Sequence, residues 1–340
     1  MTIVVTGGCG YIGSHVCVKL IEHGYDVLIL DDFSNARADV PQRIGMITGC
    51  VPHVLRVDVS DARAVRAALA DVRVEGAIHL AGLKAVAESV RMPLAYYRAN
   101  VSGTINVREA IGDATFVFSS SATVYGRPDR CPIDEEAPTA PVNPYGKSKL
   151  MAERVLLDAA AAAPGGSTVL LRYFNPVGAH SSGRIGDDPR GIPNNLMPSI
   201  ERVAVGLEPA LFVHGRDYDT RDGTAVRDYV HIEDIAEAHV RALDCERDEP
   251  LIVNLGSAAG ATVLEVITAF ERVTGRALPV RFGPRRDGDI PAMWADAGRA
   301  RALLGWRAKR TLNDACTDAL RWRTYASREL ETSSPALHPV

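Results

Sequence analysis

Residues 3–31 read IVVTGGCGYIGSHVCVKLIEHGYDVLILD, and this stretch decides the fold. A short apolar run, typical of a buried strand, is followed by Gly7, Gly10 and Gly13 in the spacing G-x-x-G-x-x-G and then by a helical run. Glycines at these places let the backbone turn tightly and approach a pyrophosphate at the positive end of a helix. A glycine triplet alone is a weak signal, but here a second strand follows and ends at Asp31. The stretch therefore predicts a βαβ unit that binds a dinucleotide.

The acidic residue that ends the second predicted strand indicates which dinucleotide is bound. Asp31 lies at about the spacing from the glycines where such folds carry a carboxylate for both ribose hydroxyls. The same charge repels a 2′-phosphate, so NAD is favoured over NADP, although the nearby Arg37 argues the other way. Asp58 ends the next predicted strand, where it either reaches the adenine amino group or is an ordinary turn-forming aspartate.

The first half of the chain repeats one sequence pattern. A short run rich in Val and Ile is followed by a Gly or Asp turn and then by an amphipathic helix, which is the pattern of βαβ units. Nearly continuous apolar character indicates strands that are buried on both faces. We expect an α/β fold, a doubly wound parallel Rossmann sheet with a smaller mixed α/β substrate lobe. The strands are expected at 3–6, 26–30, 54–57, 77–80, 116–119 and 169–173.

This pattern breaks after about residue 175, where Gly- and Pro-rich stretches and shorter, mixed elements begin. We therefore expect an NAD-binding Rossmann domain over residues 1–174 and a substrate-binding domain over 175–326. Residues 229–255 resemble a helix followed by a strand, so this segment is able to pack back onto the first domain. Residues 327–340 are polar and contain proline, and we expect a mobile tail there.

Composition excludes several classes of protein. The 340 residues are 46% hydrophobic and carry a net charge of −4, which argues against a nucleic-acid partner because phosphate binding needs a clustered basic face. The six cysteines contain no C-x-x-C pair, and His231 and His239 lack a third ligand at a suitable spacing, so no metal is expected. The chain enters a strand within two residues, which leaves no room for an export signal, and it has no membrane-spanning run. We expect a cytoplasmic protein without a membrane partner.

Tyr145 and Lys149 form the most specific pattern outside the glycine loop. They are one helical turn apart and project from one face of a helix that Pro144 is suited to begin. A strand ending in three serines, 119–121, lies upstream and can supply a hydroxyl to the same cleft. A free tyrosine has a pKa near ~10, and about 4 kcal/mol of preferential stabilisation of the phenolate brings it close to ~7. The positive charges of Lys149 and of a cationic nicotinamide ring can provide this stabilisation of the phenolate.

These residue types predict a proton-transfer site. Tyr145 is expected to be the base and Lys149 the group that tunes its pKa. Ser121 is expected to hydrogen-bond the oxygen that exchanges its proton, although an ordinary turn hydroxyl is the alternative there.

Seven stretches of the chain strongly resemble the UDP-galactose 4-epimerases, a family of the extended short-chain dehydrogenase/reductase type. The resemblance runs from the first strand to about Arg323, and the stretches in the second lobe are more specific than the glycine loop. They are TGGCGYIG (6–13), AGLKAV (81–86), SSSATVYG (119–126), RYFNPVGA (172–179), GIPNNLMP (191–198), VRDY (226–229) and PRRDGD (284–289).

The resemblance implies roles for individual residues. On the cofactor side it implies a tightly held NAD, contacted by the glycine loop and by the following set: Tyr11, Ile12, Asp31, Asp58, Ala81, Gly82, Lys84, Asn100, Lys149 and Tyr173. On the substrate side it implies that the second domain binds a nucleotide sugar. Asn175, Asn195 and Leu196 would hold that sugar nucleotide, residues 211–214 would pass the uracil, Arg227, Arg286 and Asp289 would surround the uridine diphosphate, and Met293 would border the sugar pocket. Each arginine taken singly is as well explained as a surface ion-pair residue.

The implied activity is reversible epimerisation of UDP-galactose and UDP-glucose at C4, through a 4-keto intermediate and transient reduction of bound NAD. Epimerisation of a UDP-linked N-acetylhexosamine, xylose or glucuronate is the nearest alternative, since pocket shape decides between them. A 4,6-dehydratase is less favoured because Ala122 and Thr123 follow Ser121, where that family carries an acidic pair. A non-catalytic NAD sensor is disfavoured by the joint presence of Ser121, Tyr145 and Lys149.

The resemblance also implies a homodimer. Two helical stretches, residues 94–111 and 145–162, have apolar residues on more than one face. In the family, the equivalent helices pair across a two-fold axis.

Overall fold

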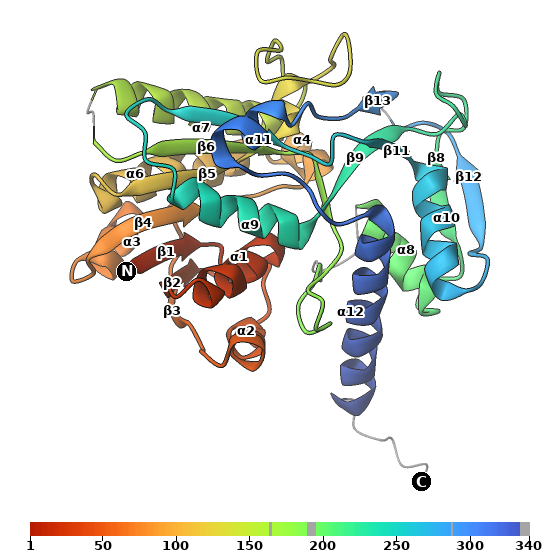
Figure 1. Cartoon of the computed structure of the whole chain (residues 1–340), viewed down its shortest axis with the longest axis horizontal. Coiled ribbons are helices and arrows are strands. Elements are labelled where there is room, and N and C mark those ends of the chain that lie inside the picture. The colour runs from red at the N-terminus through yellow and green to blue at the C-terminus, as the bar shows by residue number, and fades with distance from the viewer. Residues whose placement is uncertain (163–164, 189–194, 287, 334–340) are drawn as a thin grey trace.

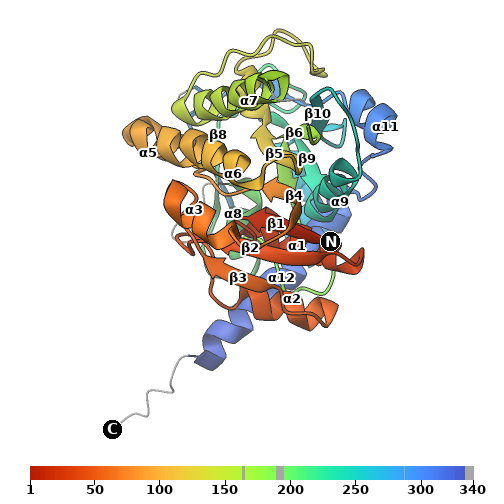
Figure 2. The ribbon, with the colours of Figure 1, turned by 90° about the vertical axis from the view of Figure 1, so that its left-hand side faces the viewer.

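The computed structural model describes residues 1–162, 165–188, 195–286 and 288–333, the side chains of 329–333 excepted. Figure 1 shows a large sheet wrapped in helices beside a group of shorter elements, with the long helix α12 projecting away from both. In the end-on view of Figure 2 the large sheet is the middle of three layers.

The large sheet is parallel throughout and has the strand order β10-β6-β5-β4-β1-β2-β3. The part 3-2-1-4-5-6 is the order of a doubly wound dinucleotide-binding fold, and β10 is added beside β6. Ligands of such sheets bind at the carboxyl ends of the strands, where the order reverses, which here is between β1 and β4. The strands are β1 (Thr2–Thr6), β2 (Asp26–Asp31), β3 (His53–Arg56), β4 (Val74–His79), β5 (Thr115–Ser121), β6 (Thr168–Tyr173) and β10 (Leu251–Leu255).

Helices cover both faces of this sheet, as the pattern of buried strands predicted. On one face, α3, α6 and α7 pack their apolar side chains on the sheet, and α4 and α5 lie against α7. On the other face, α1 and α9 pack together, and α11 joins their cluster. These helices are α1 (Tyr11–Glu22), α2 (Val40–Thr48), α3 (Ala62–Leu69), α4 (Val86–Arg91), α5 (Pro93–Tyr97), α6 (Gly103–Ile111), α7 (Pro144–Ala162), α9 (Ile232–Leu243) and α11 (Gly298–Leu304).

Two short irregular helices adjoin the sheet. A π-helical turn, Arg98–Ser102, joins α5 to α6, so the single helix expected over 94–111 is interrupted in its middle. A 3-10 turn, Ala122–Tyr125, follows β5 directly.

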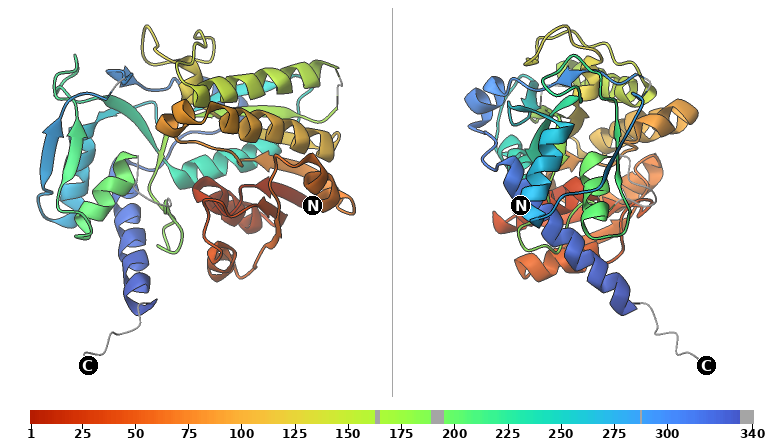
Figure 3. Two further views of the ribbon diagram at one scale, coloured as in Figure 1. Left: turned by 180° about the vertical axis from the view of Figure 1, so that it is seen from behind. Right: turned by 90° about the vertical axis from the view of Figure 1, so that its right-hand side faces the viewer.

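The second lobe is a mixed α/β structure. Strand β9 (Val226–His231) pairs with β7 (Asn175–Val177), β11 (Gly260–Thr262) and β13 (Ala292–Met293), while β8 (Leu211–His214) pairs with β12 (Val280–Gly283). Helices α8 (Leu196–Ala204), α10 (Val263–Thr274) and α12 (Leu312–Ser333) share one apolar cluster. Thr262 and Glu265 form a reciprocal capping box that starts α10. The view from behind in Figure 3 shows this lobe beside the sheet.

The predicted fold class is confirmed, but the domain boundaries interleave. Residues 229–255 contribute α9 and β10 to the first lobe, because β10 pairs with β6 and α9 packs on α1. The expected tail begins later than residue 327, since α12 continues to Ser333; residues 334–340 lie outside the described part. Among the described helices, none combines the length and the apolar character that a membrane crossing requires.

Candidate active site

A cavity of about 580 Å³ lies between the lobes, at the carboxyl ends of the strands. The glycine loop forms one wall. Gly7 has φ +68°, which favours glycine, and a Cβ on Gly13 would lie 2.1 Å from the Gly7 carbonyl oxygen. Only glycine therefore fits at these two positions, and α1 begins between them at Tyr11. The positive end of α1 faces the cavity, as a pyrophosphate site requires.

The carboxylate predicted for the ribose is held rigidly at the end of β2. Asp31 accepts hydrogen bonds from the backbone N–H groups of Cys9 and Phe33, each at 2.9 Å. Burial raises its pKa, and these two hydrogen bonds lower it. Each of its oxygens keeps one lone pair for a ligand hydroxyl. Asp58 also lines the cavity, two residues beyond the end of β3.

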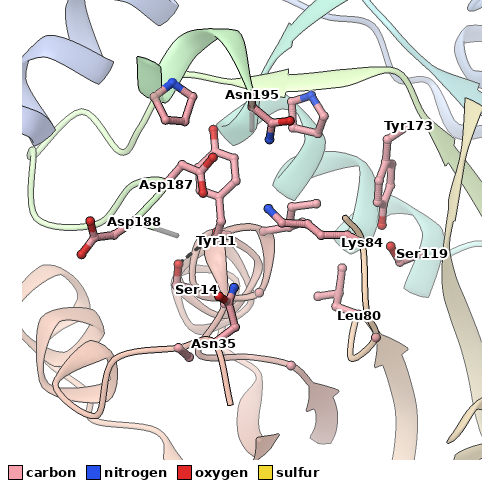
Figure 4. A pocket seen from close by; sticks show the side chains of 18 of the residues that line it. Tyr11, Ser14, Asn35, Leu80, Lys84, Ser119, Tyr173, Asp187, Asp188 and Asn195 are labelled. Atoms are coloured by element: carbon pink, nitrogen blue, oxygen red, sulfur yellow. Dashed lines mark hydrogen bonds between the residues drawn. The ribbon is translucent and has the colours of Figure 1, made fainter. Parts of the chain in front are cut away.

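Lys84 reaches into the same space from the loop after β4. Figure 4 shows its side chain stretched across the cavity towards Tyr11, with Tyr173 and Ser119 behind it and Asn35 on the opposite side. Ala81 and Gly82 of this loop line the cavity as well.

The three proton-transfer residues meet at one side of the cavity. Tyr145 and Lys149 come from the first turns of α7, and Ser121 is the last residue of β5. The Ser121 hydroxyl lies beside Tyr145 and lowers its pKa, and it accepts a hydrogen bond from Thr123 Oγ1 at 2.9 Å. Lys149 Nζ donates to the Ser119 carbonyl oxygen at 2.7 Å and lies 4.9 Å from the centre of the Phe118 ring.

Burial dominates the electrostatics of these groups. It raises the pKa of Tyr145, and the hydrogen bond from Ser121 lowers it. Burial also lowers the pKa of Lys149 to about 8, against the opposing effect of the Glu153 charge. A pKa near 8 leaves Lys149 mostly charged at neutral pH, so it is able to stabilise a phenolate beside it.

Tyr173, the last residue of β6, is fixed by a histidine of α9. His239 Nδ1 donates to the Ile235 carbonyl oxygen at 2.8 Å, so its Nε2 accepts from the Tyr173 hydroxyl at 2.5 Å. Burial lowers the pKa of His239 to about 4 and keeps it neutral in this role. His239 is therefore a buried structural residue that orients Tyr173.

The second lobe brings its predicted residues to the opposite wall. Asn175 lies in β7, two residues after Tyr173, and Asn195 and Leu196 begin α8. Arg227 of β9 pairs with Asp289 at 2.5 Å, and Asp289 also accepts from the Tyr218 hydroxyl at 3.2 Å. Arg286 lines the wall beside them. Two guanidinium groups, of Arg227 and Arg286, and two asparagine side-chain amides therefore line this half of the cavity.

Comparison with known proteins agrees with this geometry. A profile of the NAD dependent epimerase/dehydratase family matches residues 3–256. The UDP-glucose 4-epimerase of Bacillus subtilis is 50% identical over 329 residues, which make up 95% of this chain and 97% of that protein. The chain belongs to the NAD-dependent epimerase/dehydratase family.

Solved structures of this family superpose closely on the chain. A UDP-glucose-4-epimerase from Stenotrophomonas maltophila, with bound NAD and formylated UDP-arabinopyranose, has a TM-score of 0.94 and 47% identity and covers 97% of this chain and 99% of its own. A UDP-glucose 4-epimerase from Bifidobacterium longum in complex with NAD+ and UDP has a TM-score of 0.92 and 44% identity, with 96% and 99% covered. The resemblance inferred from the motifs is confirmed, and so is NAD as the cofactor.

Asn100, Met293 and the segment 211–214, which was expected at the uracil, do not line the cavity in the described part of the chain. Asn100 is 1% exposed, and its side chain bonds the backbone of Leu83 and the Ser148 hydroxyl, so it holds the Gly82 loop from behind. Met293 is half-buried in β13 and packs on a cluster that includes Phe174. Phe174, in contrast, lines the cavity.

Other residues line the cavity that the sequence did not single out. They include Asp187, Asp188, Glu201 and Tyr229. Glu201 is buried against Arg323 of α12 at 3.1 Å, and burial raises its pKa to about 8. No local pattern marks Glu201, because its partner is 122 residues away. Tyr229 ends the quoted motif 226–229, which was the available signal, and Asp187 lies between the motifs 172–179 and 191–198.

Proposed function

We propose that the chain interconverts UDP-galactose and UDP-glucose at C4, with NAD as its resident cofactor. The observation that carries the proposal is the shared cavity. It joins Ser121, Tyr145 and Lys149 to a dinucleotide loop on one wall and to a cationic, amide-rich wall on the other. The names of the relatives support the same substrate, and the formylated UDP-arabinopyranose and the UDP bound in two solved neighbours support a uridine nucleotide.

The residues present fit NAD. A Cβ on Gly13 would fill the cradle at the start of α1, and Asp31 at the end of β2 suits two ribose hydroxyls and opposes a 2′-phosphate. We expect Lys84, Lys149 and Tyr173 to contact the nicotinamide half. When bound, NAD supplies the hydride acceptor and donor for C4 of the sugar, and the chain's own residues move the proton and hold the nucleotide.

Tyr145 is the base in this proposal. Its phenolate removes the proton of the 4-hydroxyl, and the resulting phenol later returns a proton to the 4-keto oxygen. Ser121 donates to the same oxygen atom and Lys149 stabilises the phenolate, which needs about 4 kcal/mol of such help to form near neutral pH.

The second lobe grips the nucleotide rather than the sugar. Arg227 and Arg286 present donors suited to phosphate oxygens, and Asn175 and Asn195 add amide groups. Binding energy from this remote part of the substrate holds the 4-keto intermediate while its sugar turns and presents its other face to Tyr145. This division explains how one base on one wall serves both epimers.

A homodimer is part of the proposal, and the exposed side chains of α4, α5 and α7 support it. Leu94 is 75% exposed, and Val90, Met92 and Met151 are also exposed. Together they leave apolar surface on the outer side of the helices that cover the catalytic residues, on elements that pack against one another.

The decisive experiment is incubation of the purified, NAD-loaded protein with UDP-galactose, with UDP-glucose followed by chromatography. Conversion that starts from either sugar and reaches one equilibrium mixture is the expected result. Parallel reactions with UDP-N-acetylglucosamine, UDP-xylose and UDP-glucuronate rank the alternative substrates. A 4-keto-6-deoxy product would instead indicate a dehydratase, and no turnover of any of these sugars would contradict the proposal.

A further inference from the structure

A buried ion pair lies directly behind the proton-transfer residues and takes no part in the chemistry described so far. Glu153 of α7 and Arg172 of β6 are 1% and 4% exposed. Arg172 donates two hydrogen bonds to the carboxylate, at 2.7 Å to Oε2 and 3.0 Å to Oε1. Its third nitrogen donates to the Tyr125 hydroxyl at 2.9 Å, and Tyr125 donates in turn to Asn254 at 2.7 Å. The network is fully satisfied.

The pair fixes the register of α7 on β5. Residues 145, 149 and 153 are spaced by four and share one face of α7. Two of them bond serines that end β5, because Lys149 donates to the Ser119 carbonyl oxygen and Glu153 accepts from the Ser120 hydroxyl. The third, Tyr145, lies beside Ser121, whose hydroxyl lowers its pKa. Glu153 is the contact farthest from the cavity, and Arg172 attaches it to the next strand.

We propose that Glu153, paired with Arg172, is a positioning residue of the proton-transfer site that fixes α7 against the serines of β5 and keeps Lys149 charged. The inference rests on the proposed function of Tyr145 and Lys149. It assigns a task to a group that touches neither substrate nor cofactor.

Stability alone does not account for such a pair. Removing two charges from water costs several kcal/mol, and well-packed apolar residues of similar volume often stabilise a core as much or more. The pair instead fixes the position of α7 relative to β6 and places a charge near Lys149. A bidentate guanidinium and carboxylate admit one relative placement of α7 and β6, which an apolar contact does not impose.

The charge acts on Lys149. Several titratable groups surround Lys149: Glu153 on α7 and His79 on β4 interact with its charge, and Tyr145, Lys84 and Tyr173 line the same cavity. Burial lowers the pKa of Lys149 to about 8, and Glu153 is the group that raises it. Burial also lowers the pKa of His79 to about 3, so His79 carries no charge against it. Without the Glu153 charge, Lys149 would lose its proton at a lower pH.

The test is the pH profile of kcat. If charged Lys149 is required, activity falls as pH rises through its pKa, so the wild-type alkaline limb is expected near pH 8. Glu153→Gln keeps the shape and most hydrogen bonds of the side chain but removes its charge. We expect its alkaline limb to move to lower pH by about half a unit or more, because an opposite charge nearby favours the protonated amine.

Two further variants separate charge from packing. Arg172→Lys keeps the positive charge but loses the bidentate hydrogen bonds to Glu153. It is therefore expected to lower kcat and to leave the alkaline limb of the pH profile at the wild-type pH. Glu233→Gln removes another buried carboxylate, one paired with Arg310 far from α7, and is expected to leave the limb at the wild-type pH. Thermal unfolding of each variant shows whether it is folded. If Glu153→Gln is not, the double change Glu153→Gln with Arg172→Gln removes both charges and is expected to shift the limb in the same direction.

An alkaline limb that stays at the wild-type pH in the folded Glu153→Gln or double variant, even with reduced kcat, would overturn the inference. A limb shifted equally by Arg172→Lys would overturn it as well, because charge would then not be the cause. Failure of the proposed function is distinguishable from both outcomes, since wild-type protein would then show no epimerisation to profile.

Discussion

Replacing Tyr145 by Phe tests the proton-transfer assignment most directly, because it removes one oxygen and little else. The Tyr145 ring packs edge-on against Tyr96, with centroids 6.5 Å apart and an interplanar angle of 80°. Phe keeps that contact. Ser121 loses one partner but still accepts from Thr123 N at 3.2 Å and from Thr123 Oγ1 at 2.9 Å. We therefore expect the variant to fold and to retain NAD.

The expected loss follows from the role of the oxygen. General acid-base catalysis contributes about 10²- to 10⁴-fold, and each tenfold step is about 1.4 kcal/mol of activation free energy. Tyr145→Phe should therefore lower kcat by at least ~10²-fold, which corresponds to about 2.7 kcal/mol. The KM for UDP-galactose should change little, because the nucleotide is gripped by the opposite wall.

The assay is conversion of UDP-galactose to UDP-glucose, together with the NAD content released on denaturation and the melting temperature. Tyr25→Phe is the matched control, since it removes a hydroxyl that donates to Asp244 at 2.6 Å outside the cavity. Its kcat should equal that of the wild type. Turnover by Tyr145→Phe within a few fold of the wild type, at normal NAD content, would refute the role of Tyr145 as the base.

Four further predictions concern single positions. Lys149→Ala should lose at least ~10²-fold in kcat and release part of its NAD, which spectroscopy of the denatured protein measures; full activity would contradict its role. Gly13→Ala should fail to retain NAD and should unfold at lower temperature, because the added Cβ would meet the Gly7 carbonyl oxygen at 2.1 Å. An unchanged NAD content would contradict the assignment of the glycine loop as the NAD-binding site. Light scattering of the wild type should give twice the 36.5 kDa mass of one chain. The Leu94→Glu variant should give the mass of a single chain, and a wild-type protein with that single-chain mass would contradict the homodimer. Met293 packs on the cluster that includes the cavity-lining Phe174, so Met293→Ser should raise and Met293→Tyr should lower kcat/KM for UDP-N-acetylglucosamine relative to UDP-glucose. An unchanged ratio would show that Met293 does not affect the choice of sugar.

Elements of the sheet were predictable where backbone pairing coincides with apolar side chains. The strand expected at 169–173 is found as β6, one residue longer. The apolar run predicts a strand over 116–119, and only the serine run 119–121 indicates its end, whereas β5 as a paired strand continues to Ser121. Serines give no apolar signal, yet Ser120 and Ser121 pair with Arg172 and Tyr173 through the backbone alone. The extension matters, because it brings Ser121 to the cavity.

The interrupted helix shows a second limit of local patterns. Residues 94–111 have the composition of one helix, but a π-helical turn at Arg98–Ser102 breaks it. The turn places Asn100 where its side chain bonds both Leu83 and Ser148. Those bonds join segments that are 17 and 48 residues away, so no window of sequence contains the reason for the turn. The motif resemblance implied that Asn100 contacts the cofactor. In the structure, its hydrogen bonds hold the loop around Leu83 instead.

The two lobes are tied together at the chemistry itself. Tyr173 ends β6 on the cofactor side, and two residues later Asn175 begins β7 on the substrate side. Strand β9 pairs with β7 and carries Arg227, then continues directly into α9, whose His239 fixes the Tyr173 hydroxyl. Backbone pairing and hydrogen bonds therefore connect β7 and β9, which we propose to bind the nucleotide sugar, to Tyr173, which we propose to contact the cofactor, in one closed circuit. Because of that circuit, a shift of the substrate wall would be transmitted to Tyr173, so the walls are expected to keep a fixed spacing while the sugar turns between them.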